Sequence, residues 1–398
     1  MNPLKRISGD FRRLLLATLF FGATGGIFMS TLNNYLSDAH GFTAASRGWL
    51  EFPRELPGFL IFMVVGLLLL RLRESRIAAL AMVATAVGAL GLGYLSPGIS
   101  MLVVWIVIWS LGDHIIFAVE GPIGLKLAKR GGEGRRLGQL GGARNLGVIL
   151  GVSVVWLLAR FMGDRYDLFY LVAAICAALA GFFYMRLDLG KQDPPSRKLV
   201  YHKEYHIFYA ISALFGIRKQ IFLVFGAWVL VDLHGVPVST IALLYFLASL
   251  LGVVLRPLLG DVIDWLGERR VLAFDEIMLI VVCLIYAFSS NLLPKPYDLY
   301  LLYGAYILDH ILFALRIART TYLKKIARDP SHITPTISLG ITIDHTVAMT
   351  LPVLSGFIWE RYGHQYVFLM AAAVAVVGFF ICLRIKVPDQ TAQDVHGS

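Results

Sequence analysis

Long apolar runs separated by short polar segments make up most of the chain. Each run has about the 20 residues that an α-helix needs to cross a hydrocarbon core of about 30 Å. We place these runs approximately at 14–36, 45–70, 75–95, 99–125, 137–161, 166–187, 206–232, 239–260, 270–290, 298–322, 334–358 and 366–386. The pattern therefore predicts an all-α polytopic membrane protein with 12 transmembrane helices.

The first six runs and the last six repeat one another in order. Several residues match along corresponding runs, among them Phe21, Gly22, Asp38 and Gly41 with Phe215, Gly216, Asp232 and Gly235, and GDHIIFA at 112–118 with LDHILFA at 308–314. A repeat of this length indicates a duplicated domain rather than a solenoid. We expect two pseudo-symmetric six-helix bundles, at 1–187 and 206–398, joined by a polar linker at 188–205.

Composition agrees with a membrane protein, since 58% of residues are hydrophobic and 16% are charged. A soluble domain has about a quarter of its residues charged. The chain has 36 Lys and Arg residues and 26 Asp and Glu residues. This excess of basic residues comes from the loops of a membrane protein, so no nucleic-acid partner is expected. Basic residues gather at both termini, in the linker and in alternate loops, which places these parts in the cytoplasm. The expected location is the plasma membrane, or the inner membrane of a Gram-negative cell.

Ionisable residues inside the predicted spans are the main candidates for function, because charge is costly in a membrane. In the fourth run, Asp113, Phe117 and Glu120 share one helical face, and His114 adjoins them. The tenth run repeats the pattern with Asp309, His310, Phe313 and Arg316. These faces are expected to carry substrate and protons. The alternative is a structural ion-pair network that closes the two halves.

The seventh run contains a basic pair that is expected to lie near mid-membrane. The apolar segment 221–231 alone is only about 16 Å long and cannot span. Adding 206–217 completes the span and places Arg218, Lys219 and Gln220 inside it. The alternative is that these residues flank a short or tilted helix.

Three further spans carry charge. The second has Glu51, Arg54 and Glu55 near Pro53 and Pro57, which suggests a kinked helix facing a cavity. The fifth has Arg144, and the eleventh has Asp344 and His345.

The loop after the eighth run carries a recognisable motif. Gly260, Asp264, Gly267 and Arg269 match the signature G-x-x-x-D-[RK]-x-G-[RK]-[RK], whereas Trp265 and Glu268 depart from it. With the six-plus-six repeat, the chain resembles the major facilitator superfamily over nearly its whole length. The resemblance implies a gating role for this loop and a central cavity lined by the first, fourth, seventh and tenth helices. It also implies that the second and eleventh helices are neighbours, so that Arg54 pairs with Asp344, although simple interhelical hydrogen bonding is an equal alternative. The fifth run lacks the proline of the antiporter motif, which disfavours drug export.

Neither a cofactor nor a metal is expected. The chain has no G-x-x-x-x-G-K-[ST], H-E-x-x-H or G-x-S-x-G motif, so it is not expected to be an enzyme. Adjacent Asp and His residues on a helix point about 100° apart and chelate poorly. The Asp-x-His-Gly segments are instead expected to end helices, with Gly41 and Gly235 as C-terminal caps. Cys176, Cys283 and Cys382 lie in apolar runs and are expected to be structural.

These observations predict a monomeric, proton-coupled secondary transporter of a small organic anion or zwitterion, working by alternating access. The residues expected to bind substrate are Arg218, Lys219, Gln220, Arg316, Arg54 and Arg144. Those expected to couple protons are Asp113, His114, Glu120, Asp309, His310, Asp344 and His345. Export of lipophilic or cationic compounds through the acidic groups is the alternative, and a non-transporting sensor or scaffold is a second one.

Overall fold

Helices account for the regular structure of the described part of the chain. The computed structural model describes residues 9–128, 132–189, 201–329 and 332–386. Within them, 12 helical segments are long and apolar enough to cross a membrane, which confirms the predicted number of spans. Their limits lie within a few residues of the predicted ones.

The first six spans are formed by seven helices. They are α1 (Gly9–His40), α2 (Ala44–Phe59), α3 (Ile61–Leu69), α4 (Glu74–Tyr94), α5 (Ile99–Lys126), α6 (Glu133–Met162) and α7 (Tyr166–Met185). The second span consists of α2 and α3, which are separated at Leu60. Since α2 contains Pro53 and Pro57, and proline removes a helical hydrogen bond, this break agrees with the predicted kink.

The last six spans are less regular. Their elements are η2 (Lys203–Tyr205), α8 (His206–Ile221), η3 (Phe222–Gly226), η4 (Val229–Leu233), α9 (Val238–Leu266), α10 (Glu268–Leu292), α11 (Tyr297–Leu312), η5 (Phe313–Arg316), α12 (Ile317–Ile326), α13 (Ile333–Tyr362) and α14 (His364–Leu383). The seventh span, Lys203–Leu233, changes from α-helix to the π-helical η3 directly after Gln220 and Ile221. The tenth changes to a 3₁₀ turn, η5, between α11 and α12. Such departures often mark functional positions in a helix.

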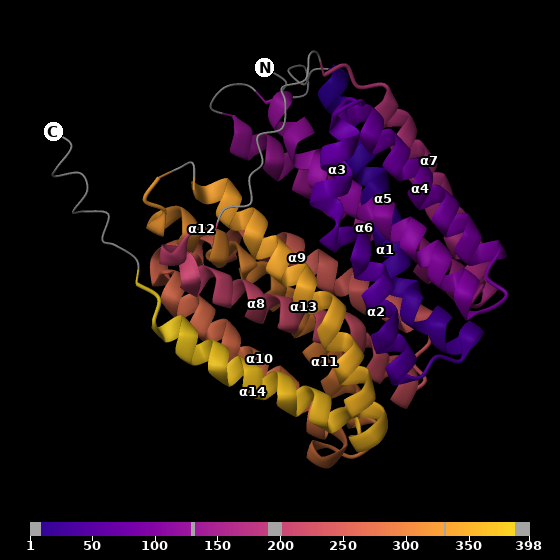
Figure 1. Cartoon of the computed structure of the whole chain (residues 1–398). Coiled ribbons are helices and arrows are strands. Elements are labelled where there is room, and N and C mark those ends of the chain that lie inside the picture. Colours follow the sequence, from indigo (N-terminus) through magenta and orange to yellow (C-terminus); the bar gives the residue numbers. More distant parts are fainter. Residues whose placement is uncertain (1–8, 129–131, 190–200, 330–331, 387–398) are drawn as a thin grey trace. The chain divides into compact units, whose positions relative to one another are not determined.

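The chain forms two compact units. Unit 1 comprises Met1–Thr43, Trp49–Ser196 and Gly235–Leu250, and unit 2 comprises Ala44–Gly48, Arg197–His234 and Leu251–Ser398. In unit 1, α1 packs on α6 and α7, and α4 packs on α5 and α7. In unit 2, α8 packs on α13 and α14, and α10 packs on α14 and α11 (Figure 1).

Glycines allow the closest helix contacts in unit 1. A Cβ on Gly22 would collide with the carbonyl oxygen of Arg144, and one on Gly147 would collide with that of Leu19. A Cβ on Gly26 would lie 2.7 Å from the Val148 carbonyl oxygen. Small residues at four-residue spacing let membrane helices approach in this way. The close packing of α1 on α6 therefore requires glycine, which has no side chain, at these positions.

The repeat extends to this packing. Gly216 of α8 corresponds to Gly22, and a Cβ there would lie 2.8 Å from Oδ1 of Asp344 on α13. The predicted caps are also confirmed, because Gly41 and Gly235 have positive φ of 59° and 60° at the ends of α1 and η4. Duplicated glycines thus occupy equivalent structural positions in both halves.

Candidate functional site

A buried arginine in α8 joins three helices of unit 2. The Nη1 atom of Arg218 donates to Oδ2 of Asp275 on α10 at 2.6 Å, and Nη2 donates to Oδ1 of Asp309 on α11 at 3.3 Å. All three residues are buried. A guanidinium with two carboxylates has its charge offset by fixed partners. The structure thus brings together the predicted Arg218 and Asp309 and adds Asp275, which sequence reasoning missed.

The next residue of α8 makes a second ion pair. Lys219 Nζ donates to Oδ2 of Asp344 on α13 at 3.0 Å. Both side chains are half-buried. Gln220 is fully buried on the same helix. The predicted basic pair therefore lies inside the seventh span, and each cation has a carboxylate partner within unit 2.

An arginine of α12 occupies a different environment. The guanidinium carbon of Arg319 lies 4.6 Å from the centre of the Phe215 ring on α8, and Phe215 lies 5.1 Å from Phe313, centre to centre. Its buried Nη1 has no hydrogen-bond partner among the described residues. Arg319 also interacts electrostatically with Asp344. Sequence reasoning missed this residue, although a second arginine after Arg316 within the tenth apolar run was an available signal.

An additional acid of unit 2 adjoins the Arg218 cluster. Glu276 follows Asp275 on α10 and is half-buried. Its carboxyl oxygens lie 2.7 and 2.8 Å from where a Cβ on Gly378 of α14 would be. It interacts electrostatically with Asp275 and Arg218. Arg218 and Lys219 therefore interact with four carboxyl groups, those of Asp275, Glu276, Asp309 and Asp344.

In unit 1, Glu120 is the centre of a corresponding network. This buried carboxylate forms an ion pair with Arg144 of α6. It also accepts hydrogen bonds from Thr18 Oγ1 at 2.7 Å and from the Tyr184 hydroxyl at 3.0 Å. The Arg144 guanidinium lies 5.2 Å from the Phe21 ring centre and 4.9 Å from that of Phe117. Glu120 thus connects α5 with α1, α6 and α7.

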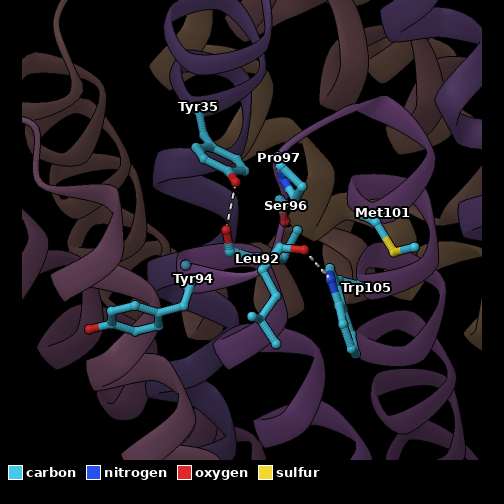
Figure 2. A pocket seen from close by; sticks show the side chains of 9 residues that line it. Tyr35, Leu92, Tyr94, Ser96, Pro97, Met101 and Trp105 are labelled. Carbon is cyan, nitrogen blue, oxygen red and sulfur yellow. Dashed lines mark hydrogen bonds between the residues drawn. The ribbon is translucent and has the colours of Figure 1, made fainter.

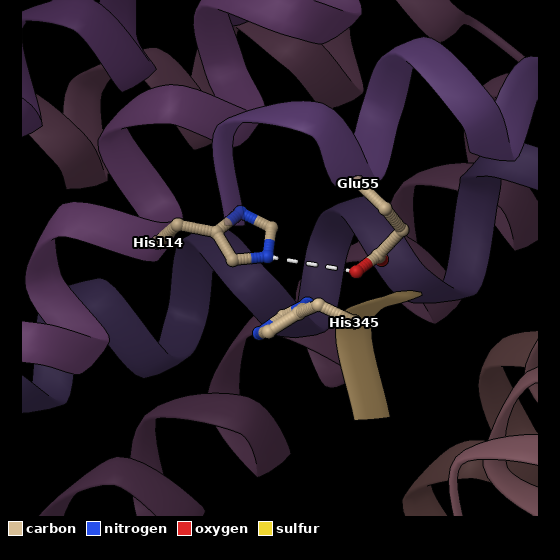
Figure 3. A group of neighbouring side chains, drawn as sticks. All are labelled: Glu55, His114 and His345. Carbon is tan, nitrogen blue, oxygen red and sulfur yellow. Dashed lines mark ion pairs between the residues drawn. The ribbon is translucent and has the colours of Figure 1, made fainter. Parts of the chain in front are cut away.

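The charged residues of α2 form a separate cluster in unit 1. Arg54 Nη2 lies 2.5 Å from Oε2 of Glu51 and 2.6 Å from Oε1 of Glu55. His114 Nε2 lies 3.8 Å from Oε2 of Glu55 (Figure 3). Ser110 Oγ donates to the Arg54 carbonyl oxygen at 2.5 Å. Arg54 and Asp344 were expected to pair with each other. Arg54 forms ion pairs with Glu51 and Glu55 of its own unit, and Asp344 forms one with Lys219 of its own unit.

The predicted helical faces differ in their surroundings. On α5, Glu120 is buried and Asp113 is half-buried, whereas Phe117 is 53% exposed. On α11, His310 Nδ1 lies 2.9 Å from the Tyr306 carbonyl oxygen, and on α13 His345 is half-buried. Arg316 lies in η5, and its side chain is outside the described part. Of the acids on these faces, Glu120 and Asp309 thus form ion pairs with other helices.

A residue of the predicted gating loop forms an ion pair that the motif did not indicate. Gly267, with φ of 78°, turns the chain between α9 and α10, while Asp264 and Arg269 are exposed and Gly260 lies within α9. Glu268 is buried and pairs with Lys325 at 2.7 Å. In unit 1, Glu74 and Lys126 form an equivalent pair at 2.7 Å. The residue that departs from the signature therefore belongs to a duplicated structural contact.

A pocket of about 590 Å³ lies elsewhere in unit 1, between the end of α4 and the start of α5 (Figure 2). The Tyr35 hydroxyl donates to the Leu92 carbonyl oxygen at 2.6 Å, and Trp105 Nε1 donates to that of Leu95 at 2.8 Å. These polar groups are satisfied by the protein itself. None of the predicted site residues lines this pocket.

Solved transporter structures share this fold. The nucleoside transporter NupG aligns with a TM-score of 0.75 at 16% identity, covering 95% of this chain and 99% of that one. A D-xylose-proton symporter aligns with a TM-score of 0.71 at 14% identity, covering 95% and 97%. The peptide transporter POT in complex with sulfate aligns with a TM-score of 0.72 at 15% identity, covering 94% of each chain.

The sequence itself places the chain in a family. No curated protein matches it. The family model described as Major Facilitator Superfamily matches residues 14–323, which is well over half of the chain. The described part of the chain has 12 helices long and apolar enough to cross a membrane, and it shares the fold of solved transporters. With these findings, the match shows that the chain is a multi-pass membrane protein of the Major Facilitator Superfamily of transporters.

Proposed function

We propose that this protein is a proton-coupled secondary transporter of a small organic anion or zwitterion. The observation that carries the anion assignment is Arg319, whose Nη1 is buried without a hydrogen-bond partner among the described residues. A buried cationic donor without an acceptor is costly. A carboxylate or phosphate bound at Arg319 would satisfy it and gain a charge-assisted hydrogen bond.

The neighbours of Arg319 supply the rest of a binding site. Phe215 offers an aromatic surface beneath the guanidinium. Lys219 follows Phe215 by one helical turn on the same face of α8. A substrate carboxylate at Arg319 would compete with Asp344 for Lys219. We infer that Phe215, Lys219 and Arg319 form the unit 2 part of the substrate site.

This competition offers a route to proton coupling. While Lys219 pairs with Asp344, the ammonium group balances the charge of the carboxylate. When substrate takes Lys219, a proton would have to take over that balance, because an unpaired charge is costly inside a membrane. Release of substrate would restore the pair and expel the proton. Asp344 would thus carry one proton with each anionic group.

The Arg218 cluster is proposed as a second coupling element. Asp309 lies farther from Arg218 than Asp275 does, 3.3 Å against 2.6 Å. Movement of α11 relative to α8 would release Asp309 first and leave Arg218 paired with Asp275. In unit 1, Asp113, His114 and the Glu120–Arg144 pair are proposed to play the corresponding part. His310 and His345 remain candidates for proton transfer, and Gln220, Arg316 and Arg54 remain candidates for substrate contact.

The proposed setting is a plasma membrane or bacterial inner membrane, with both termini in the cytoplasm. It rests on the concentration of Lys and Arg at the termini, the linker and alternate loops. The halves 1–187 and 206–398, joined by 188–205, are proposed to alternate access to the site as a monomer.

Export of a cationic compound is the second candidate. It is favoured by the excess of carboxyl groups in unit 2, where Glu276 adjoins an already paired Asp275. A cationic substrate would reduce the repulsion among these acids. Such a transporter would exchange protons for its substrate rather than import both together.

The test is transport by the purified protein in proteoliposomes. A panel of carboxylates, phosphorylated metabolites, amino acids and organic cations is offered with and without an imposed pH gradient. Accumulation of an anion or zwitterion when protons flow in the same direction supports the proposal. Transport of organic cations only, driven by opposite proton flow, supports the alternative, and no pH dependence for any transported compound would refute proton coupling.

A further inference from the structure

A group of three potential metal ligands lies in unit 2, outside the charged clusters described above. His202 and Glu204 precede α8, and His332 directly precedes α13. One ring nitrogen of each histidine and one carboxylate oxygen of Glu204 lie within 4.8 Å of one another. Two segments that are distant in sequence thus present imidazole and carboxylate groups to one point.

The two imidazole rings of His202 and His332 are already stacked on each other. Their centres are 3.9 Å apart and their planes differ by 25°. Ligand atoms around a tetrahedral zinc ion are about 3.3 Å apart, since zinc–nitrogen and zinc–oxygen bonds are about 2.0–2.1 Å. The three ligand atoms therefore need to move closer together by at most about 1.5 Å. The exposed Glu204 side chain has room to make this movement.

Neighbouring tyrosines hold both histidines. The hydroxyl oxygen of the buried Tyr205 lies 3.0 Å from Nδ1 of His332 and accepts the backbone N–H of Arg328 at 3.1 Å. When Nδ1 of His332 donates to this oxygen, its Nε2 keeps a lone pair for a metal. Ligating histidines generally have their second nitrogen fixed in this way. The backbone N–H of His202 donates to the Tyr209 hydroxyl at 3.3 Å, which positions the second ligand.

We propose that His202, Glu204 and His332 bind one divalent transition-metal ion, with Zn²⁺ as the best-suited ion and water as the fourth ligand. Two imidazoles and one carboxylate are a common zinc set, and the same donors accept Co²⁺ and Ni²⁺. The ligands come from separate segments, unlike the adjacent Asp-His residues that chelate poorly. Bound metal would tie the segment before α8 to the segment before α13.

The test is metal binding by the full-length protein in detergent, purified through an affinity tag that contains no histidine. Titration with Zn²⁺ by calorimetry should show one site per chain, and Co²⁺ should give a visible absorption band. His202→Ala and His332→Ala should each lower Zn²⁺ affinity at least about tenfold and remove the Co²⁺ band. His206→Ala, which changes an exposed histidine of the adjoining turn, should bind as the unchanged protein does.

A second readout separates loss of the site from loss of the fold. Saturating Zn²⁺ should raise the melting temperature of the unchanged protein and of His206→Ala, because a ligand that binds only the folded state stabilises it. It should leave the melting temperature of a folded His202→Ala or His332→Asn variant unchanged. The proposal is wrong if the unchanged protein binds no Zn²⁺, or if both histidine variants keep its affinity.

Discussion

The guanidinium of Arg319 lies over the ring of Phe215, 4.6 Å from its centre. In unit 1, Arg144 lies over Phe21 and Phe117 at 5.2 and 4.9 Å. Phe21 and Phe117 are the repeat equivalents of Phe215 and Phe313, and each aromatic pair is in contact. The two arginines, however, come from helices that do not correspond. The duplication thus kept an aromatic surface with a cation above it and changed the helix that provides the cation.

Replacement of Arg319 should weaken binding of the transported anion. Arg319→Ala is expected to raise KM about 10- to 100-fold, because a hydrogen bond to a charged group contributes about 1.5–3 kcal/mol. Arg319→Lys should be affected less, since it keeps the charge. Arg160→Ala, at an exposed position outside the predicted sites, is the control. Initial uptake rates in proteoliposomes measure these values, and an unchanged KM in Arg319→Ala would exclude the anion site.

Neutralising the repeated aspartates should separate exchange from accumulation. Asp309→Asn and Asp113→Asn are expected to abolish pH-driven accumulation, because amides bind no proton in the working pH range. Counterflow exchange should survive, since exchange needs no net proton movement, and Arg218 keeps Asp275 as a partner in Asp309→Asn. Asp164→Asn, at an exposed position outside the predicted sites, should accumulate normally. If both repeated-aspartate variants still accumulate substrate, these two aspartates are not coupling elements, and Asp344→Asn is the variant that tests the remaining proposed site.

The duplicated pairs Glu74–Lys126 and Glu268–Lys325 should stabilise the fold. Glu268→Gln leaves Lys325 without its carboxylate, and we expect a loss of about 1–3 kcal/mol, since Lys325 is only partly buried. The melting temperature should fall in Glu268→Gln and in Lys325→Gln. In a double-mutant cycle, the two effects should not add. Additive losses would show that the pair contributes no coupling energy.

Glycines of α6 offer a matched comparison of packing. Gly147→Ala should sharply reduce the yield of folded protein, because its Cβ would collide with the Leu19 carbonyl oxygen. Overpacking of this kind costs about 1–3 kcal/mol or more. Gly142→Ala, on the same helix with nothing within 4 Å of its Cβ, should be neutral or stabilising because alanine favours helix. Size-exclusion profiles and melting temperatures of the two variants give the result, and equal behaviour would contradict this account of the α1–α6 contact.

Cysteine labelling should establish the orientation. In a variant without the three native cysteines, Ser196→Cys in the linker should react with an impermeant thiol reagent only after cells are opened. Arg165→Cys, in the exposed turn between α6 and α7, should react in intact cells. The opposite pattern would reverse the assigned topology.

The sequence alone determined the features that depend on chain length and local geometry. Twelve spans were predictable because the bilayer fixes the length of each apolar run. The glycine caps after α1 and η4 were predictable because a positive φ favours glycine. The duplication was visible in aligned residues such as Phe21 and Phe215.

Only the tertiary structure decided which charges pair. The sequence placed Arg218 and Asp309 within spans, but not Asp275 as the nearest partner of Arg218. It marked Glu268 as a departure from the motif and gave no sign of Lys325. It also missed Arg319 over Phe215. Hydrophobic patterning shows which segments enter the membrane. The partner of each buried charge depends on the rotation, tilt and local breaks of helices that are distant in the chain, and these are set by packing between helices.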